Sequence, residues 1–371
     1  MGDDLRIALV HDWLTGMRGG ERVLEALCER FPGAELFTLI HVPGSVAPII
    51  EQRRIHTSAL QFLPGVRHYY RECLPLFPSL IEQFDLERFD LVISSSHCVA
   101  KSVLTRPDAV HLCYCHTPMR YAWDQFDAYF GPIRIGPAAS AAMRLVMDRL
   151  ADWDRDTADR VGCYVTNSQH VAGRIRRYYN REAIVVYPPV DTDFFHPDSA
   201  VPERYALVVS ALVPYKRIDV AIDACRAARV PLKIVGSGPD RARLERSAGP
   251  DVQFLGRQND ENLRTLYRRA AVAVMPGEED FGIVPVEAQA CGRPVIALGR
   301  GGALETVVPG ETGGLVDEST PQAFAAAIAA AVDRAWDSAA IRQHAERFGR
   351  RRFFDDMSTV IDNALRERAT C

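Results

Sequence analysis

The segment Glu278–Gly292, EEDFGIVPVEAQACG, holds two carboxylates and the signals for one helix. Pro285 suits the first turn of that helix, and Gly292 suits its C-terminal cap. Glu279 then lies in the loop before the helix, and Glu287, eight positions later, lies in its first turn or two. Backbone N–H groups at a helix start bind anions, and a carboxylate beside them suits two neighbouring hydroxyls of a sugar. Both glutamates are equally expected as solvated charges that a helix start favours, so two interpretations stand at this point.

Apolar runs alternate with amphipathic stretches on both sides of this segment. Continuous apolar runs indicate strands covered on both faces, and their alternation with helices indicates an α/β fold of doubly wound parallel sheets. In the second half we expect strands at Tyr205–Leu212, Leu232–Gly236, Val252–Gly256, Ala271–Pro276 and Pro294–Leu298, and helices at Ile218–Arg229, Asn262–Ala270 and Val284–Cys291. In the first half we expect strands at Arg6–Val10, Leu91–Ser96, Val110–Cys115 and Cys163–Ser168, and a helix at Glu21–Phe31.

A proline-rich stretch, YPPVDTDFFHPDSA at Tyr187–Ala200, separates the two halves. Neighbouring prolines do not continue a helix or a central strand. We therefore predict a first domain over residues 1–188, a linker over 189–200 and a second domain over 201–349. The last helix, at about 350–371, is expected to pack back on the first domain.

Length and composition fit two globular domains of a cytoplasmic protein. The chain has 371 residues, a formal net charge of −4 and a pI near 6.2, which argues against a nucleic-acid partner. Its nine cysteines form no C-x-x-C pair, which argues against a structural zinc site or a disulfide framework. The opening residues, MGDDLR, do not resemble a signal peptide, and no apolar run reaches the ~20 residues that span a bilayer.

The pattern EDFGIVPVE resembles the signature of family-four retaining glycosyltransferases of GT-B architecture. Six other segments resemble motifs of that family in the same order: Gly16–Glu21, Tyr114–Pro118, Asn167–Val171, Tyr187–Asp191, Pro214–Arg217 and Gly236–Pro239. The resemblance covers essentially the whole chain. It implies two Rossmann-like domains that face a central cleft, and transfer of a sugar from a nucleotide-sugar with retention of anomeric configuration.

The resemblance also implies roles for individual residues. Glu287 would hold the ribose of the donor, Glu279 the hydroxyls of the transferred sugar, and Lys216 the diphosphate. His116 would lie beside the anomeric carbon, so that His116, Lys216 and Glu279 form the catalytic set. The donor would also contact Gly19, Gly20, Ala211, Gly236, Gly238, Phe281, Gly282, Ile283 and Val284. Taken singly, each feature has an ordinary explanation: a tight turn, a structural histidine or a solvated Lys216–Arg217 pair.

No metal and no cofactor are expected. Departure of a nucleotide diphosphate needs positive charge, which Lys216 and a helix start can supply instead of a metal ion. The letters Asp191-Thr192-Asp193 lie in the proline-rich stretch, where they are interpreted as turn residues.

One position departs from the family pattern. The family places an arginine five residues before the lysine of the phosphate loop, where this chain has Ala211. Three explanations stand: natural loss in an inactive relative, compensation by Arg217 or Arg257, or an engineered substitution.

The sub-pattern VPYKRID resembles members that build bacterial surface polysaccharides, often as mannosyltransferases, so GDP-mannose is the first expected donor. The acceptor is expected to be a glycan or a lipid-linked molecule. Candidate acceptor residues are Arg120, Tyr121 and Trp123, because aromatic faces stack on sugar rings. The basic and aromatic stretch Arg53–Tyr70 is a candidate for peripheral contact with the inner face of the cytoplasmic membrane, and equally an ordinary surface segment.

Two other classes of function stay open. An epimerase or a phosphorylase on the same architecture would act on the same kind of ligand, although the lysine context of a phosphorylase cofactor is not found. A sugar-nucleotide-binding protein with weakened or lost catalysis would explain Ala211.

Overall fold

A computed structural model describes residues 5–369, apart from the side chains at positions 128 and 369. The chain divides into two compact units: Val190–Arg352 is one, and the chain on either side of it, Met1–Pro189 with Phe353–Cys371, is the other. Residues 1–4 and 370–371, and with them part of the opening segment MGDDLR, lie outside the described residues.

The N-terminal unit is built on a seven-stranded parallel sheet in the order β3-β2-β1-β4-β5-β6-β7. Side chains of one strand alternate between two cores: Ala8 and Val10 of β1 enter one, and Leu9 enters the other. The strands are β1 (Ile7–His11), β2 (Glu35–Thr38), β3 (Ile55–Thr57), β4 (Leu91–Ser96), β5 (Val110–Cys115), β6 (Cys163–Thr166) and β7 (Ala183–Val185).

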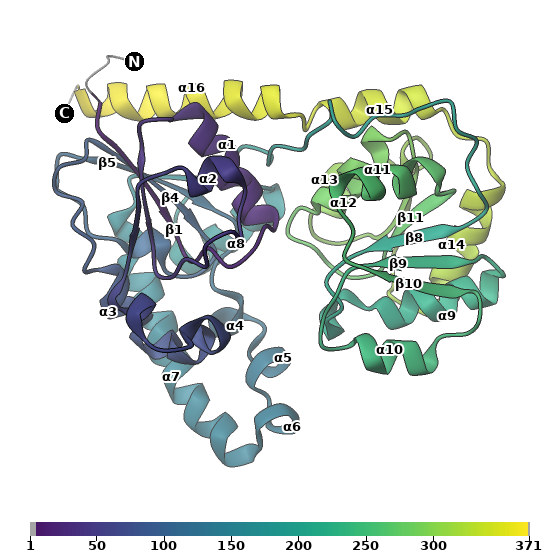
Figure 1. Cartoon of the computed structure of the whole chain (residues 1–371), viewed down its shortest axis with the longest axis horizontal. Helices are drawn as coiled ribbons and strands as arrows, with labels where there is room; N and C mark the ends of the chain where they lie inside the picture. The colour runs from purple at the N-terminus through teal and green to yellow at the C-terminus, as the bar shows by residue number, and fades with distance from the viewer. Residues whose placement is uncertain (1–4, 370–371) are drawn as a thin grey trace. The chain divides into compact units, whose positions relative to one another are not determined.

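Helices cover both faces of this sheet, and α5, α6 and the start of α7 project away from it (Figure 1). The α-helices are α1 (Gly19–Arg30), α2 (Pro48–Glu51), α3 (Phe77–Ile81), α4 (Arg120–Trp123), α5 (Phe126–Phe130), α6 (Pro132–Ile135), α7 (Pro137–Asp156) and α8 (Gln169–Tyr179). Short 3-10 turns are η1 (Ala59–Phe62), η2 (Val66–His68), η3 (Tyr70–Leu76), η4 (Ala100–Ser102) and η5 (Thr157–Arg160).

The C-terminal unit repeats the design with six parallel strands in the order β10-β9-β8-β11-β12-β13. The strands are β8 (Ala206–Val209), β9 (Leu232–Val235), β10 (Val252–Gly256), β11 (Val272–Met275), β12 (Val295–Leu298) and β13 (Gly313–Val316). Its helices are η6 (Pro214–Lys216), α9 (Ile218–Ala228), α10 (Arg241–Ser247), α11 (Asp260–Arg269), α12 (Ile283–Ala290), α13 (Ala303–Thr306), α14 (Pro321–Asp333) and α15 (Ser338–Glu346). The predicted pair of Rossmann-like parallel sheets is confirmed.

The last helix, α16 (Arg350–Ala369), passes from the second unit into the first (Figure 1). From Phe353 on it packs with β1, β5 and α1 in one of the N-terminal cores. The ring of Phe353 lies 6.0 Å from that of Tyr114 on β5. At the other end of the C-terminal unit, Val190 and Phe195, from the stretch expected to be a linker, are buried, and the N–H of Val190 donates to the carbonyl of Phe348.

Each sheet has one topological switch point, where the order of successive strands changes direction. The direction of succession reverses between β1 and β4 in the first sheet and between β8 and β11 in the second. Loops at such a switch point diverge to opposite faces and leave a crevice at the carboxyl ends of the strands, where α/β proteins bind ligands.

Within residues 5–369, no helix is long and apolar enough to cross a membrane.

Candidate functional site

Two loops touch at the switch point of the C-terminal unit. One carries η6, and the other runs from Gly277 toward α12. A Cβ atom on Gly277 would lie 2.8 Å from the carbonyl oxygen of Tyr215 and 2.9 Å from Cα of Lys216. A residue with a side chain could not approach so closely, so this glycine brings Lys216 next to Glu279.

The ammonium group of Lys216 and the Glu279 carboxylate form an ion pair. The two side chains retain 14% and 21% of their exposure, so the pair is accessible to a ligand. The sequence predicts that these groups contact two parts of one donor, the diphosphate and the sugar. In the structure these two groups neutralise each other, and an entering phosphate would compete with Glu279 for Lys216.

Helix α12 starts directly after this pair. Gly282 precedes its first residue with φ 85°, a left-handed conformation that glycine adopts without strain. Ile283 and Val284 are the first two helical residues, and the N–H groups of a first turn have no partner within the helix. Phe281 is buried against Phe348, with ring centroids 5.6 Å apart, which anchors the loop.

Glu287 lies one turn into α12 and has a fixed partner. The hydroxyl of Tyr267, on α11, donates to Oε2 of Glu287 at 2.8 Å. Burial first, and then the nearby Glu287 carboxylate, raise the pKa of Tyr267 well above its ordinary value, so the phenol keeps its proton. The buried Tyr267 hydroxyl therefore fixes the orientation of the Glu287 carboxylate.

The turn after β9 packs on the backbone that follows β8. A Cβ atom on Gly236 would lie 1.8 Å from the carbonyl oxygen of Ser210, and one on Gly238 would lie 2.2 Å from that of Leu212. Both predicted donor glycines therefore permit backbone contact between two loops at the carboxyl end of the sheet.

Ala211 lies between these two contacts and is exposed. Of its two proposed substitutes, Arg257 is tied to the same turn, because its Nε donates to Oγ of Ser237 at 3.0 Å. Arg217 lies at φ 52° before α9, with its Nε 3.5 Å from Asp219. The Arg257 side chain thus lies beside the turn whose glycines pack on the residues before and after Ala211.

The N-terminal unit has its own polar cluster at the switch point between β1 and β4. The Asp12 carboxylate accepts four backbone N–H groups, from His97 and Cys98 at 2.7 and 3.0 Å and from Val99 and Ala100 at 2.7 and 2.8 Å. Burial by itself raises the pKa of Asp12, but its interactions with His97 first, and then with His11, outweigh burial and hold that pKa well below its ordinary value. Asp12 thus fixes the loop after β4 as a permanent anion.

Three histidine rings surround this loop: His11, His97 and His116. Oγ of Ser95 lies 2.8 Å from Nε2 of His116 and 3.1 Å from Nδ1 of His11. The ring of His97 lies 6.1 Å from that of His11 and 6.5 Å from that of His116. Burial first, and then the charges of the other two histidines, lower the pKa of His116 to about 3, so its ring is neutral at physiological pH.

The glycine-rich loop joins the same cluster. Helix α1 begins at Gly19, and a Cβ atom on Gly20 would lie 3.4 Å from Nε2 of His116 and 3.5 Å from Cε1 of His11. The start of α1 therefore rests against two histidine rings, and Glu21 in its first turn accepts the N–H of Arg18 at 3.0 Å.

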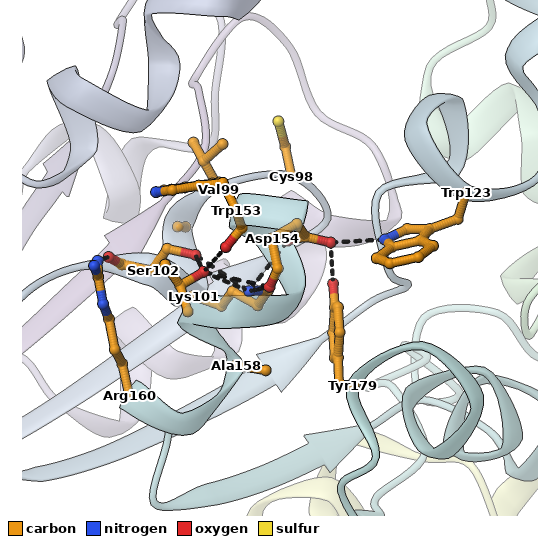
Figure 2. Close-up of polar contacts among 12 residues, drawn as sticks. Cys98, Val99, Lys101, Ser102, Trp123, Trp153, Asp154, Ala158, Arg160 and Tyr179 are labelled. Atoms are coloured by element: carbon orange, nitrogen blue, oxygen red, sulfur yellow. Dashed lines mark hydrogen bonds and ion pairs between the residues drawn. The ribbon is translucent and has the colours of Figure 1, made fainter. Parts of the chain in front are cut away.

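A buried ion pair ties the loop after β4 to helix α7 (Figure 2). Nζ of Lys101, on η4, lies 3.1 Å from Oδ1 of Asp154, on α7, and both side chains are almost fully buried. The other carboxylate oxygen of Asp154 accepts the indole N–H of Trp123 and the hydroxyl of Tyr179, each at 2.8 Å. The loop is thus fixed on one side by Asp12 and on the other by α7.

The predicted acceptor residues Arg120, Tyr121 and Trp123 all lie on α4. The hydroxyl of Tyr121 lies 2.7 Å from the sulfur of Cys98, and the ring of Trp123 stacks on Tyr178 with centroids 4.7 Å apart. Tyr178 therefore covers one ring face of Trp123. Acceptor contact stays a prediction.

Several residues of these clusters were not predicted from the sequence, among them His11, Asp12, Ser95 and Tyr267. The available signal for the first three was polar residues at the carboxyl ends of apolar strands, in LVHDW and LVISSSH. Tyr267 carries no such signal, because it occupies an ordinary apolar position of a helix.

The acidic pair Asp191–Asp193 takes part in a turn, where Oδ1 of Asp191 accepts the N–H of Phe194 at 3.0 Å. Among the described residues, no three His, Cys, Asp or Glu side chains are grouped to hold a metal ion. Metal independence stays a prediction.

Two family models match the chain, one over each of its halves. Residues 17–194 match the family model for Glycosyltransferase Family 4, and residues 190–351 match the model for Glycosyl transferases group 1. The chain is 28% identical over 169 residues to an uncharacterized glycosyltransferase of Methanocaldococcus jannaschii (44% of this chain, 47% of the relative). It is 32% identical over 229 residues to a D-inositol 3-phosphate glycosyltransferase of Mycolicibacterium vanbaalenii (52% and 50%). The chain thus spans about half the length of the curated relatives it matches.

Among solved structures, Anabaena Alr3699/HepE in complex with UDP and glucose resembles it with a TM-score of 0.69 at 17% identity, over 96% of this chain and 99% of that one. The two matched models together run from residue 17 to residue 351, and the fold neighbour covers both units. The chain therefore belongs to the family-4-like glycosyltransferases of GT-B fold.

Proposed function

We propose that this protein is a retaining, metal-independent glycosyltransferase that moves a sugar from a nucleotide-sugar to a glycan or lipid-linked acceptor. The observation that carries the proposal is the Lys216–Glu279 pair at the start of α12, with Glu287 one turn further on. A cation, a helix start and two carboxylates within one loop–helix segment suit the diphosphate, the sugar and the ribose of one donor.

The chemistry follows from these groups. Breaking the bond to the leaving group places negative charge on the diphosphate, and Lys216 with the α12 N–H groups would stabilise that charge. Glu279, released from Lys216, would accept hydrogen bonds from sugar hydroxyls. Retention rests on the family resemblance, in which the departing phosphate takes the proton of an acceptor that attacks from the same face.

For the donor we propose GDP-mannose, on the resemblance of VPYKRID to polysaccharide mannosyltransferases. UDP-glucose is the competitor, since a fold neighbour binds UDP and glucose. A thermal-shift series with GDP, UDP, ADP and their sugars separates the two, because a ligand at 100 times its Kd adds about 2.7 kcal/mol. Stabilisation by UDP but not GDP would overturn the proposed donor, and stabilisation by none of them would overturn the site.

Transfer is then measured with EDTA and with added Mg²⁺ or Mn²⁺. We expect activity to survive the chelator, and NMR of the product to show the anomeric configuration of the donor. Loss with EDTA that the metals restore, or an inverted anomer, would contradict the mechanism. Incubation with the donor alone tests the epimerase, and tight donor binding without transfer to any acceptor would favour a binding protein.

A peripheral membrane contact is the proposed route to a lipid-linked acceptor. Phe62, Leu63 and Leu76 are 82%, 44% and 55% exposed, and the exposed Arg67 and Arg71 lie in the same stretch. Apolar side chains with basic neighbours suit an anionic bilayer surface. Sedimentation with anionic but not neutral vesicles is expected, and it should weaken in Phe62→Ser.

A further inference from the structure

Four side chains of the N-terminal unit form a series of polar contacts that ends at His116. Glu21 Oε1 lies 3.9 Å from Nε2 of His11, Nδ1 of His11 lies 3.1 Å from Oγ of Ser95, and that oxygen lies 2.8 Å from Nε2 of His116. His11 and Glu21 are buried, with 0% and 3% side-chain exposure. The family resemblance gives His116 a role beside the anomeric carbon and gives the other three side chains none.

The protons in this series can be counted. A serine hydroxyl has one hydrogen and two acceptor positions, so Ser95 can donate to at most one of the two histidines. Two arrangements are therefore possible at a neutral His11: its Nδ1 accepts from Ser95 or donates to it. If Nδ1 accepts the Ser95 hydrogen, Nε2 of His116 must carry a proton to make its hydrogen bond to Oγ of Ser95; if Nδ1 donates, His116 can either donate or accept.

Glu21 selects between them. In the neutral form of His11, Nε2 either carries the proton or directs a lone pair at the Glu21 carboxylate, whose Oε1 lies 3.9 Å away. If its Nε2 were unprotonated, a lone pair would face the carboxylate in a buried site, which is repulsive. Its Nε2 therefore carries the proton, Nδ1 accepts from Ser95, and Ser95 accepts from Nε2–H of His116.

We propose that Glu21, His11 and Ser95 are positioning residues that hold His116 in its Nε2–H form, so that Nδ1 is a hydrogen-bond acceptor for a sugar hydroxyl. The part that concerns the sugar rests on the proposed glycosyltransferase function; the tautomer does not. Gly20, the residue before Glu21, lies against both rings, because a Cβ atom there would be in van der Waals contact with His116 and His11.

The tautomer is measured directly by NMR of the protein with 15N-labelled histidine, and His116 is assigned with His116→Gln. We expect one His116 form with the proton on Nε2 in the wild type. In Glu21→Gln the side-chain amide can also donate to His11, so we expect a mixture of both forms. A wild-type proton on Nδ1, or the same population in both proteins, would overturn the proposal.

Kinetics form the second arm. Ser95→Ala should lower kcat roughly 3- to 10-fold, the value of one hydrogen bond, with little change in the KM of the donor. The matched control is Ser94→Ala, which removes a 2.9 Å contact of the same kind to Nε2 of the buried His111 and should leave kcat unchanged. Equal kcat losses in the two variants would contradict a role for Ser95. Because the NMR arm needs no substrate, its failure is distinct from a failure of the glycosyltransferase proposal.

Discussion

Glu279 and Glu287 carry the same functional group eight residues apart, yet the fold gives them different partners. Glu279 is in contact with a lysine ammonium that a phosphate can draw away, so it is a group whose partner changes on binding. Glu287 accepts a hydrogen bond from a buried phenol, so its orientation exists before a ligand arrives. The first arrangement suits the transferred sugar, and the second suits a ribose that stays on the leaving nucleotide.

We predict that Glu287→Ala weakens nucleotide binding by on the order of 1.5–3 kcal/mol for each charge-assisted bond lost. Tyr267→Phe keeps the carboxylate but removes its orienting donor, so a smaller loss, about 0.5–1.5 kcal/mol, is expected. Titration calorimetry with the bare nucleotide measures both. Glu261→Ala, an exposed carboxylate on α11, is the control, and an affinity in Glu287→Ala equal to that control would refute the assignment.

A second prediction concerns the missing arginine. Because Arg257 is hydrogen-bonded to the turn that packs on the neighbours of Ala211, we expect it to supply the guanidinium for the diphosphate. Arg257→Leu should then lower the transfer rate, by up to roughly 100-fold for one charged donor, and Ala211→Arg in that background should restore part of it. Steady-state transfer rates are compared for the wild type, the two single variants Arg257→Leu and Ala211→Arg, and the double variant. An Arg257→Leu enzyme with the wild-type rate would show that another group holds the phosphate.

Type and spacing within loops were enough to predict site roles for Lys216, Glu279 and His116, and these roles stay predictions. Sequence reasoning could not find Tyr267, whose function depends on which helix packs beside α12, nor His11, whose partners lie on other strands. Such contacts arise from tertiary packing, and the letters of one segment do not encode them.

At the scale of elements, strand bounds were predictable where the strand is a long run in the sequence. The bounds of β4, β5 and β10 are those expected, because each is a run of five or six residues. Four strands were not expected: β2, β3, β7 and β13. Each of these strands has only three or four residues, and β13 begins with two glycines, which are typical of a turn.

The elements of the N-terminal unit are joined by the Lys101–Asp154 pair, and this leads to a prediction on stability. Lys101→Met leaves a buried carboxylate without its cation, which typically costs 3–5 kcal/mol. Adding Asp154→Asn removes the stranded charge, so the double variant should be more stable than Lys101→Met alone.

Urea unfolding midpoints measure this difference. Arg155→Met removes an exposed ion pair with Asp152 on the same helix and should cost less than about 1 kcal/mol. If Lys101→Met proved as mild as this control, the buried pair would not be what secures η4 to α7.

At the scale of the whole chain, the N-terminal unit is discontinuous, because α16 completes its core. Phe353, Met357 and Ile361 of this helix are each at most 2% exposed. Phe353→Ala should destabilise the N-terminal unit by about 3–5 kcal/mol, the usual value for a large buried aromatic residue, and leave the C-terminal unit unchanged.

Hydrogen exchange followed unit by unit distinguishes the two. Faster exchange is expected in β1 and β5, with no change in β8 or β11. Leu304→Ala, at a side chain that is 60% exposed in the C-terminal unit, is the control. Faster exchange in both units alike would mean that they unfold as one cooperative body.

The position of α16 also has a consequence for how the protein is made. Chains usually fold from the N-terminus as they leave the ribosome. Here residues 190–352 form one uninterrupted unit that can close during translation, whereas the first 189 residues lack part of their core until Phe353–Ile361 has been synthesised. During that interval the apolar faces of α1 and β5 are uncovered and open to chaperones. The part of the molecule that is translated first is completed last.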